Sequence, residues 1–143
     1  MNRYQIEMEN ALRQGGADIQ PGTIGQFSAT MRKFQFLFSF SPVDGGDPED
    51  CPVRIGYAGF SGGRTFPDLM HRSEVRYLRL CAYLNELNRD SGPVKYLYDG
   101  ETVRAEICFD YRSLNYAFSM LMLILKEVKK TRPELRELLN GLD

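Results

Sequence analysis

The stretch from Ser73 to Val128 decides the predicted fold. It reads SEVRYLRLCAYLNELNRD (73–90), GPVKYLYDGETVRAEICFD (92–110) and SLNYAFSMLMLILKEV (113–128). The first and third segments repeat apolar residues at helical spacing. The second alternates apolar and polar residues around Asp99-Gly100, a pair typical of two-residue hairpin turns. The stretch therefore predicts a helix, a hairpin and a second helix.

The helix expected at 73–90 carries two apolar patches, with Ser73 as its predicted N-cap. The main stripe has helical spacing and consists of Tyr77, Leu80, Cys81, Leu84 and Leu87. Val75, Leu78 and Ala82 form a second patch to one side. A helix with two such patches is either covered on two sides or offers one of them to another chain. Val75, Leu78 and Ala82 are therefore candidate protein-interaction residues.

The hairpin separates its side chains into two faces. A two-residue loop places Tyr98 opposite Glu101 and Lys95 opposite Arg104. The predicted core face consists of Val94, Tyr96, Tyr98, Val103, Ala105, Ile107 and Phe109. The mixed-polar face consists of Lys95, Leu97, Thr102, Arg104, Glu106 and Cys108. We expect this second face to be open to solvent or to a partner, so Lys95, Leu97 and Arg104 are further candidate interaction residues.

The helix expected at 113–130 has the broadest apolar arc and should be the most buried helix. Asp110 or Ser113 caps its start. Three lysines, Lys126, Lys129 and Lys130, follow near its C-terminus, where the helix dipole favours cations. The T-x-x-E spacing from Thr131, with a proline in the following turn, predicts a separate short helix over 133–140.

The N-terminal half predicts a helix followed by strands. The helix covers 2–14, and Asp18 to Gly25 is expected to be a connection that turns at Pro21-Gly22. Strands are expected at 24–31, 33–41 and 53–58. In the second of these strands, phenylalanine occupies every other position from Phe34 to Phe40, which predicts one buried sheet face.

Two loops and one histidine are candidate ligand sites. The acidic loop PVDGGDPED (42–50) lacks the alternating oxygen ligands of a calcium loop and is interpreted as a solvated turn. The loop GFSGGRTF (59–66) is interpreted as a flexible connection, with a weaker alternative in which Gly62, Gly63 and Arg64 bind an anion. His71 is the only histidine and has no obvious metal-ligating or catalytic neighbours.

The composition limits the class of protein. A chain of 143 residues that is 43% hydrophobic predicts a single domain over 1–143. The net charge of -1 argues against a general nucleic-acid binder. Three cysteines without a secretory signal predict a reduced, cytoplasmic protein. The most apolar run, Tyr116 to Leu125, is too short to insert into a membrane.

The order of elements, α-β-β-β-α-β-β-α, predicts an α+β fold in which helices pack on an antiparallel sheet. One helix ends in LNELNR (84–89), and the hairpin around Asp99-Gly100 and another helix follow it. Over about residues 75–130 this arrangement resembles the YbjN-like family of bacterial proteins, which share the type III secretion chaperone-like fold. The resemblance implies a cytoplasmic protein without catalytic residues. Proteins of this fold are similar to dimeric chaperones that hold a partner segment along sheet and helix surfaces, and family members have been described as sensory-transduction regulators.

Three functions follow as hypotheses. The first is a non-enzymatic protein-binding module, chaperone-like or regulatory, that forms a homodimer or binds another protein. The alternative is a small-ligand or anion-binding protein, or an enzyme, that uses the 59–66 loop with Arg64, with His71, Glu101 and Glu106 as further candidates. The third is an accessory subunit of a larger assembly. The sequence predicts no catalytic, cofactor-binding or metal-binding residue, and no cofactor.

Overall fold

The structure is a computed structural model that describes residues 2–40 and 51–142. The acidic loop discussed above lies outside the described residues. Helices and strands alternate in blocks along the chain: α1 (Arg3–Gln14), β1 (Asp18–Pro21), β2 (Gln26–Met31), β3 (Phe34–Phe40), β4 (Pro52–Tyr57), a 3-10 turn η1 (Gly59–Ser61), α2 (Leu69–Arg72), α3 (Glu74–Asp90), β5 (Lys95–Tyr98), β6 (Val103–Asp110) and α4 (Leu114–Asn140).

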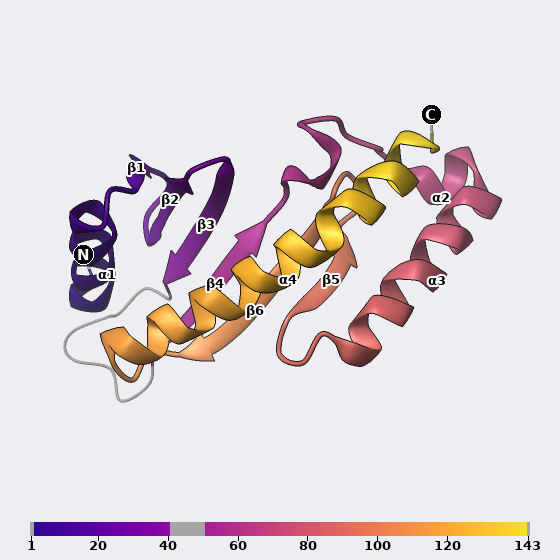
Figure 1. Cartoon of the computed structure of the whole chain (residues 1–143). Helices are drawn as coiled ribbons and strands as arrows, with labels where there is room; N and C mark the ends of the chain where they lie inside the picture. Colours follow the sequence, from indigo (N-terminus) through magenta and orange to yellow (C-terminus); the bar gives the residue numbers. More distant parts are fainter. Residues whose placement is uncertain (1, 41–50, 143) are drawn as a thin grey trace.

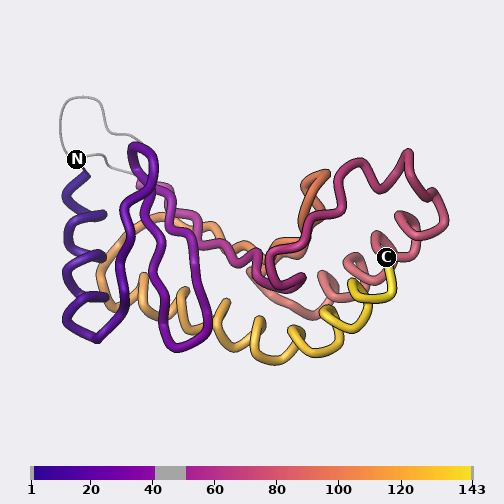
Figure 2. The backbone as a smooth tube through the Cα atoms, turned by 90° about the horizontal axis from the view of Figure 1, so that it is seen from above, coloured from indigo at the N-terminus to yellow at the C-terminus, as the bar shows by residue number. Residues whose placement is uncertain are grey.

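The fold is α+β, as predicted. Six strands form one sheet in the order β1-β2-β3-β4-β6-β5, and every neighbouring pair is antiparallel. The helices lie on one side of this sheet (Figures 1 and 2), where α4 runs across the strands between α1 and α3. The other side of the sheet carries no described helix. We call this second side the open face.

The edge strand β1 was not predicted. Residues Asp18–Pro21 were interpreted as a connection, but Asp18 pairs with Thr30 and Pro21 with Phe27. The strand has only four residues and no alternation of apolar and polar side chains, which is the pattern by which a strand is predicted from sequence. The predicted turn follows directly after it, where the Gly22 amide donates to the Gln26 carbonyl at 3.1 Å.

The alternating phenylalanines of β3 are buried, as predicted. Phe34, Phe36, Phe38 and Phe40 are each at most 5% exposed. Phe38 stacks on Phe27 of β2 with the ring centroids 4.8 Å apart. On the helix side, α4 contributes Leu121, Ile124 and Val128, which are equally buried. Ser113 caps this helix by accepting a hydrogen bond from the Tyr116 amide at 3.1 Å.

The helix α4 continues to Asn140, so the predicted break near Thr131 and the separate helix over 133–140 are wrong. Instead of capping a new helix, the Thr131 hydroxyl donates back to the Glu127 carbonyl at 2.9 Å and contacts the Tyr96 hydroxyl at 2.8 Å. Pro133 inside a helix costs about 3 kcal/mol. Leu135 and Leu139 are both fully buried, and each burial contributes ~1.5–3 kcal/mol, which offsets that cost.

The hairpin register differs from the prediction by two residues. Tyr98 pairs with Val103 and Lys95 with Glu106, whereas the sequence predicted Glu101 and Arg104 as their partners. The cause is Asp99, whose carboxylate accepts hydrogen bonds from the amides of Glu101 and Thr102 at 2.9 and 2.7 Å and thereby closes a longer loop. A shift of two residues leaves every side chain on its predicted face, so the core and open faces are as expected.

The outer edge of β5 is closed by Asn88 of α3. Its side-chain amide donates to the Tyr96 carbonyl at 2.9 Å, and its carbonyl accepts from the Tyr96 amide at 2.7 Å. Asn88 therefore takes the place of a neighbouring strand at this position. Sheet edges with unpaired backbone groups can recruit another chain, and this pair of bonds removes one such point.

Leu121→Asp should unfold the domain, because it places an unpaired charge at a position that is 2% exposed. We expect a loss of more than about 4 kcal/mol in the free energy of unfolding, measured in urea. The neighbouring substitution Met122→Asp is the control, since Met122 is 57% exposed and should cost less than about 1 kcal/mol. Equal losses for the two variants would contradict the assigned core face of α4.

Asn88→Ala should cost about 1–3 kcal/mol, because it leaves the amide and carbonyl of the buried Tyr96 without partners. Asn85→Ala is the matched control, since Asn85 is exposed on the same helix. Urea unfolding of both variants tests the difference. A cost for Asn85→Ala as large as that for Asn88→Ala would show that general helix effects, not the β5 edge, explain the loss.

Candidate functional site

The open face of the hairpin holds the predicted residues Lys95, Leu97 and Arg104. Between them and β4, Glu106 links two arginines: its carboxylate lies 3.7 Å from Arg54 Nε and 3.4 Å from Arg104 Nη2. The Arg54 side chain is 58% exposed and that of Glu106 only 14%. The centre of this face is thus a charged surface with a half-buried carboxylate beneath exposed cations.

The second predicted patch lies on α3. Val75 and Leu78 are 68% and 57% exposed, and Ala82 is also exposed, while Leu80 and Leu84 on the main stripe are buried. Ser73 caps this helix as predicted and accepts a hydrogen bond from the Arg76 amide. The described residues therefore leave the second apolar patch uncovered. These three residues do not line the two cavities described next.

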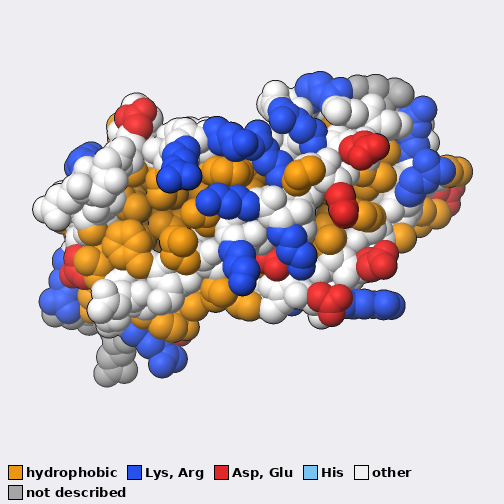
Figure 3. All heavy atoms as spheres, in the orientation of Figure 1, with side chains coloured by type: hydrophobic (Ala, Val, Ile, Leu, Met, Phe, Trp, Pro, Cys, Tyr) orange, Lys and Arg blue, Asp and Glu red, His pale blue; other side chains and the backbone are white. Residues whose placement is uncertain are grey.

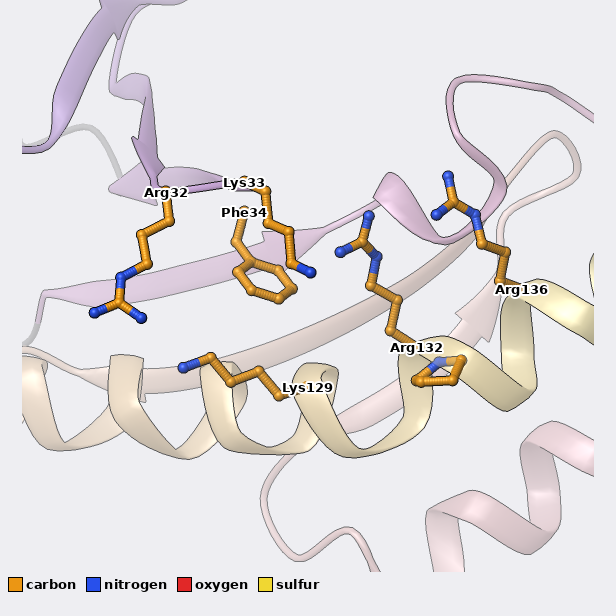
Figure 4. A pocket seen from close by; sticks show the side chains of 7 residues that line it. Arg32, Lys33, Phe34, Lys129, Arg132 and Arg136 are labelled. Carbon is orange, nitrogen blue, oxygen red and sulfur yellow. The ribbon is translucent and has the colours of Figure 1, made fainter.

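A cleft rich in basic residues lies where α4 passes the ends of the strands. It consists of two cavities of about 610 and 620 Å³ that share Lys33, Arg132 and Arg136. The first lies on the helix side and is also lined by Arg32, Phe34, Lys129 and Pro133 (Figure 4). The second extends to the open face and includes Ser28, Leu37, Gly56, Gly62, Gly63 and Arg104. We call the combined site the basic cleft, defined by Arg32, Lys33, Arg104, Lys129, Arg132 and Arg136.

Local structure explains why these cations converge. Arg32 and Lys33 form the two-residue turn between Met31 and Phe34, which pair with each other, and Arg32 has the left-handed φ of 59°. Lys129, Arg132 and Arg136 are spaced by three and four residues and therefore share one side of α4. In Figure 4 the side chains of the turn and of the helix face each other across the cleft.

Phe34 organises three of the cations. Its ring centroid lies 5.7 Å from Lys33 Nζ, 6.0 Å from Lys129 Nζ and 5.2 Å from the guanidinium carbon of Arg132. A cation over an aromatic face is stabilised by about 0.5–2 kcal/mol. The ring itself is 5% exposed. Phe34 therefore holds the charges in place, and its own surface is already covered.

Most of these charges have no acidic partner among residues 2–40 and 51–142. No described carboxylate lies within ion-pair distance of Arg32, Lys33, Lys129, Arg132 or Arg136. The Nε atom of Arg132 is buried without a hydrogen-bond partner. Arg104 differs, because Asp99 lies 3.8 Å and Glu106 3.4 Å away. Figure 3 shows Lys and Arg side chains gathered above α4 in the middle of the view.

The charges of the cleft also act on Tyr57, which lines its second cavity. Burial raises the pKa of the Tyr57 phenol above 10, and the positive charges of Arg132 and Arg136 act in the opposite direction. Tyr57 is 3% exposed. The two arginines therefore influence a buried group at the end of β4, which is consistent with their position over the strand ends.

Of the three predicted anion-binding residues in the 59–66 loop, only the two glycines line the basic cleft. Gly62 and Gly63 line the second cavity with left-handed φ angles of 64° and 88°. Arg64 does not line it: its guanidinium donates to the Asn140 side chain and stacks on Phe66 at 5.7 Å. The arginines beside the glycines are Arg132 and Arg136, which the sequence analysis did not single out.

The residues proposed for the enzyme alternative are engaged in other ways. His71 Nδ1 contacts the Asp68 carboxylate, and both side chains are more than 60% exposed. Glu106 bridges arginines, and Glu101 is exposed in the hairpin turn. In the described part of the chain, no group of three or more His, Cys, Asp or Glu side chains is placed to hold a metal ion.

No family model, no curated protein and no solved structure matches the chain. The resemblance to the YbjN-like family therefore stays a prediction. Within residues 2–40 and 51–142, no helix combines the length and the apolar character needed to cross a bilayer.

Arg104→Ala should change the free energy of unfolding by less than about 1 kcal/mol, because its side chain is 27% exposed and its ion pairs are long. Chemical denaturation measures this directly. Val103→Ala is the comparison on the opposite face of β6: Val103 is 1% exposed, and its truncation should cost clearly more. A larger loss for Arg104→Ala would mean that the hairpin faces are assigned the wrong way round.

Proposed function

We propose that the chain is a non-enzymatic protein-binding module that holds an extended, acidic segment of a partner protein on the open face of its sheet. The observation that carries this proposal is the sheet itself: six strands have helices on one side only, and the opposite side is lined by side chains without a described helix above them. A chaperone-like or regulatory role requires such a surface.

The face is better suited than the β5 edge to receive the segment. Asn88 already bonds both backbone groups of Tyr96 at that edge, so strand addition there would have to displace it. On the face, Leu37 and Leu97 are only half-buried and offer apolar contacts between the charged residues. A segment lying across the strands would cover them and exclude water.

Charge favours an acidic segment. The open face carries Arg54 on β4, Arg104 on β6 and Lys95 on the edge strand β5, against the carboxylates of Glu106 and Asp99. The other carboxylates that project from this face, Asp18 and Asp110, lie on the edge strand β1 and at the C-terminal end of β6. Opposite charges across an interface speed association and select the partner more than they add affinity.

The apolar patch on α3 gives this proposal a second contact surface. Val75, Leu78 and Ala82 offer exposed apolar side chains of the kind that mark protein interaction sites. A second copy of the chain or the partner itself could cover them. The predicted homodimer, the cytoplasmic location and the kinship with secretion chaperones belong to this proposal, and the homodimer is tested with it.

The test uses a fluorescent peptide of about eight residues, which spans at most ~27 Å when extended. The peptide repeats the sequence Glu-Ser-Leu-Ser. In the extended peptide, Glu and Leu therefore lie on one side and the serines on the other, so that one side presents both charge and apolar contact. We expect saturable binding in fluorescence anisotropy that weakens as salt rises. The double substitution Arg54→Gln and Lys95→Gln should weaken it about tenfold or more.

Two controls make the result decisive. A peptide with Lys in place of Glu should not bind. The double substitution Arg132→Gln and Arg136→Gln, which lies in the basic cleft, should leave peptide binding unchanged. The proposal fails if the Glu peptide does not bind, or if only the cleft variant weakens it. Light scattering with and without Leu78→Glu measures the proposed dimer.

A further inference from the structure

We infer that the basic cleft is a binding site for a small, multiply charged phosphate anion, recognised by its charge. This inference goes beyond the proposed partner segment and rests on five cations that the proposed segment site does not use, although Arg104 and Leu37 belong to both surfaces. Its core is the set of five cations without a described carboxylate, all of which line the first of the two neighbouring cavities (Figures 3 and 4): Arg32, Lys33, Lys129, Arg132 and Arg136.

Ion pairs within the described residues do not explain the clustering of the cations, and Phe34 contacts only three of the five. Like charges that share a site repel one another, and pairing each with a carboxylate would relieve this. Arg104, at the margin of the cleft, has such partners in Asp99 and Glu106. The five others do not within the described residues. An anion that binds here would therefore gain the attraction of several cations at once, without having to displace a described carboxylate.

The shape suits a small ligand. Each cavity measures about 600 Å³, within the usual range of ligand pockets of ~300–1,000 Å³. Lys33, Arg132 and Arg136 line both cavities, so these three cations can contact a ligand in either one. The planar guanidinium groups suit bidentate contacts with phosphate oxygens. Arg132 Nε, buried without a partner, is one donor that such a ligand could satisfy.

The glycines of the neighbouring loop keep the second cavity open. A Cβ atom at Gly62 would lie 3.1 Å from Arg136 Nη2 and would crowd its guanidinium. Gly62 and Gly63 also have the left-handed φ angles that other residues rarely adopt. The absence of side chains at this wall thus leaves Arg136 free to turn toward a ligand.

The position of Phe34 limits what is recognised. Its ring is 5% exposed and is contacted by Lys33, Lys129 and Arg132, so it offers no free face for a nucleobase. Recognition then depends on the phosphate groups. A phosphate chain carries several charges over a few ångströms, whereas carboxylates of a peptide are single charges further apart, so the compact cation cluster favours phosphate.

The experiment is isothermal titration of the full chain with inorganic tripolyphosphate, with ATP and with a hexaglutamate peptide. We expect tripolyphosphate and ATP to bind with dissociation constants within about threefold of each other, because the base adds no contact, and both to weaken steeply with salt. Hexaglutamate should bind at least tenfold more weakly.

The variants locate the site. Arg132→Gln with Arg136→Gln should weaken tripolyphosphate binding at least tenfold, and the single change of the exposed Arg136 should weaken it measurably without affecting folding. Arg54→Gln with Lys95→Gln is the control on the open face and should leave it unchanged. Thermal unfolding of each variant confirms that the fold is intact.

The inference is overturned if tripolyphosphate does not bind saturably, if ATP binds and tripolyphosphate does not, or if hexaglutamate binds more tightly than either. It is equally overturned if the open-face variant loses tripolyphosphate binding and the cleft variant keeps it. None of these outcomes concerns the alternating Glu and Leu peptide, whose binding is measured separately with the same two variants, so failure of one proposal is distinguishable from failure of the other.

Discussion

The structure depends on one constraint: a six-stranded sheet has two faces, and the chain has one long apolar helix to cover them. α4 spans 27 residues, about 40 Å at 1.5 Å per residue, and its buried residues lie on the same side of the sheet as the buried phenylalanines of β3. α1 and α3 extend this layer on either side of α4 (Figure 1). Because all of this apolar surface is used on one side, the other side must remain polar. The mixed composition of the open face therefore follows from the placement of the helices on the opposite face and does not require a ligand.

The continuity of α4 through Pro133 connects the core to the basic cleft. Thr131, Leu135 and Leu139 anchor the second half of the helix on the sheet and make the proline tolerable. Arg132 and Arg136 lie between these anchors in the sequence and on the flank of the helix next to them, so the same packing that stabilises the helix carries them past the ends of β3 and β4. A break before Pro133, as the sequence suggested, would have placed Arg136 on a different helix from Lys129, whereas the continuous helix puts both on one side.

The sequence predicted features that depend on local periodicity and missed those that depend on tertiary contacts. The buried phenylalanines and the two hairpin faces were predicted from the alternation of apolar and polar residues alone. The predicted hairpin turn was wrong, but the faces are correct because the register differs by two residues, and such a shift keeps every side chain on its face. The strand β1 and the continuation of α4 were not foreseen, since each is stabilised by partners far away in the chain: β2 for the first, and Tyr96 and the sheet for the second. The second patch with Val75 and Leu78 was recognised, because a helix wheel separates it without reference to anything outside the helix, but whether it is covered was left open until the structure showed both residues exposed.

The cations of the cleft show why a site of this kind is hidden in a single sequence. Lys129 has a sufficient local explanation if a helix ends nearby, since the dipole favours cations there. In the structure the helix continues for eleven residues beyond Lys129 to Asn140, so that explanation no longer applies. In the sequence, Arg32 and Lys33 resemble ordinary turn residues. In the structure this turn lies opposite the cations of α4, which are about a hundred residues away in the sequence. Each charge is unremarkable alone; only the fold shows that several of them converge on one cleft without a described carboxylate. A group of charges that neither helix dipoles nor ion pairs explain is the physical reason to look for a ligand.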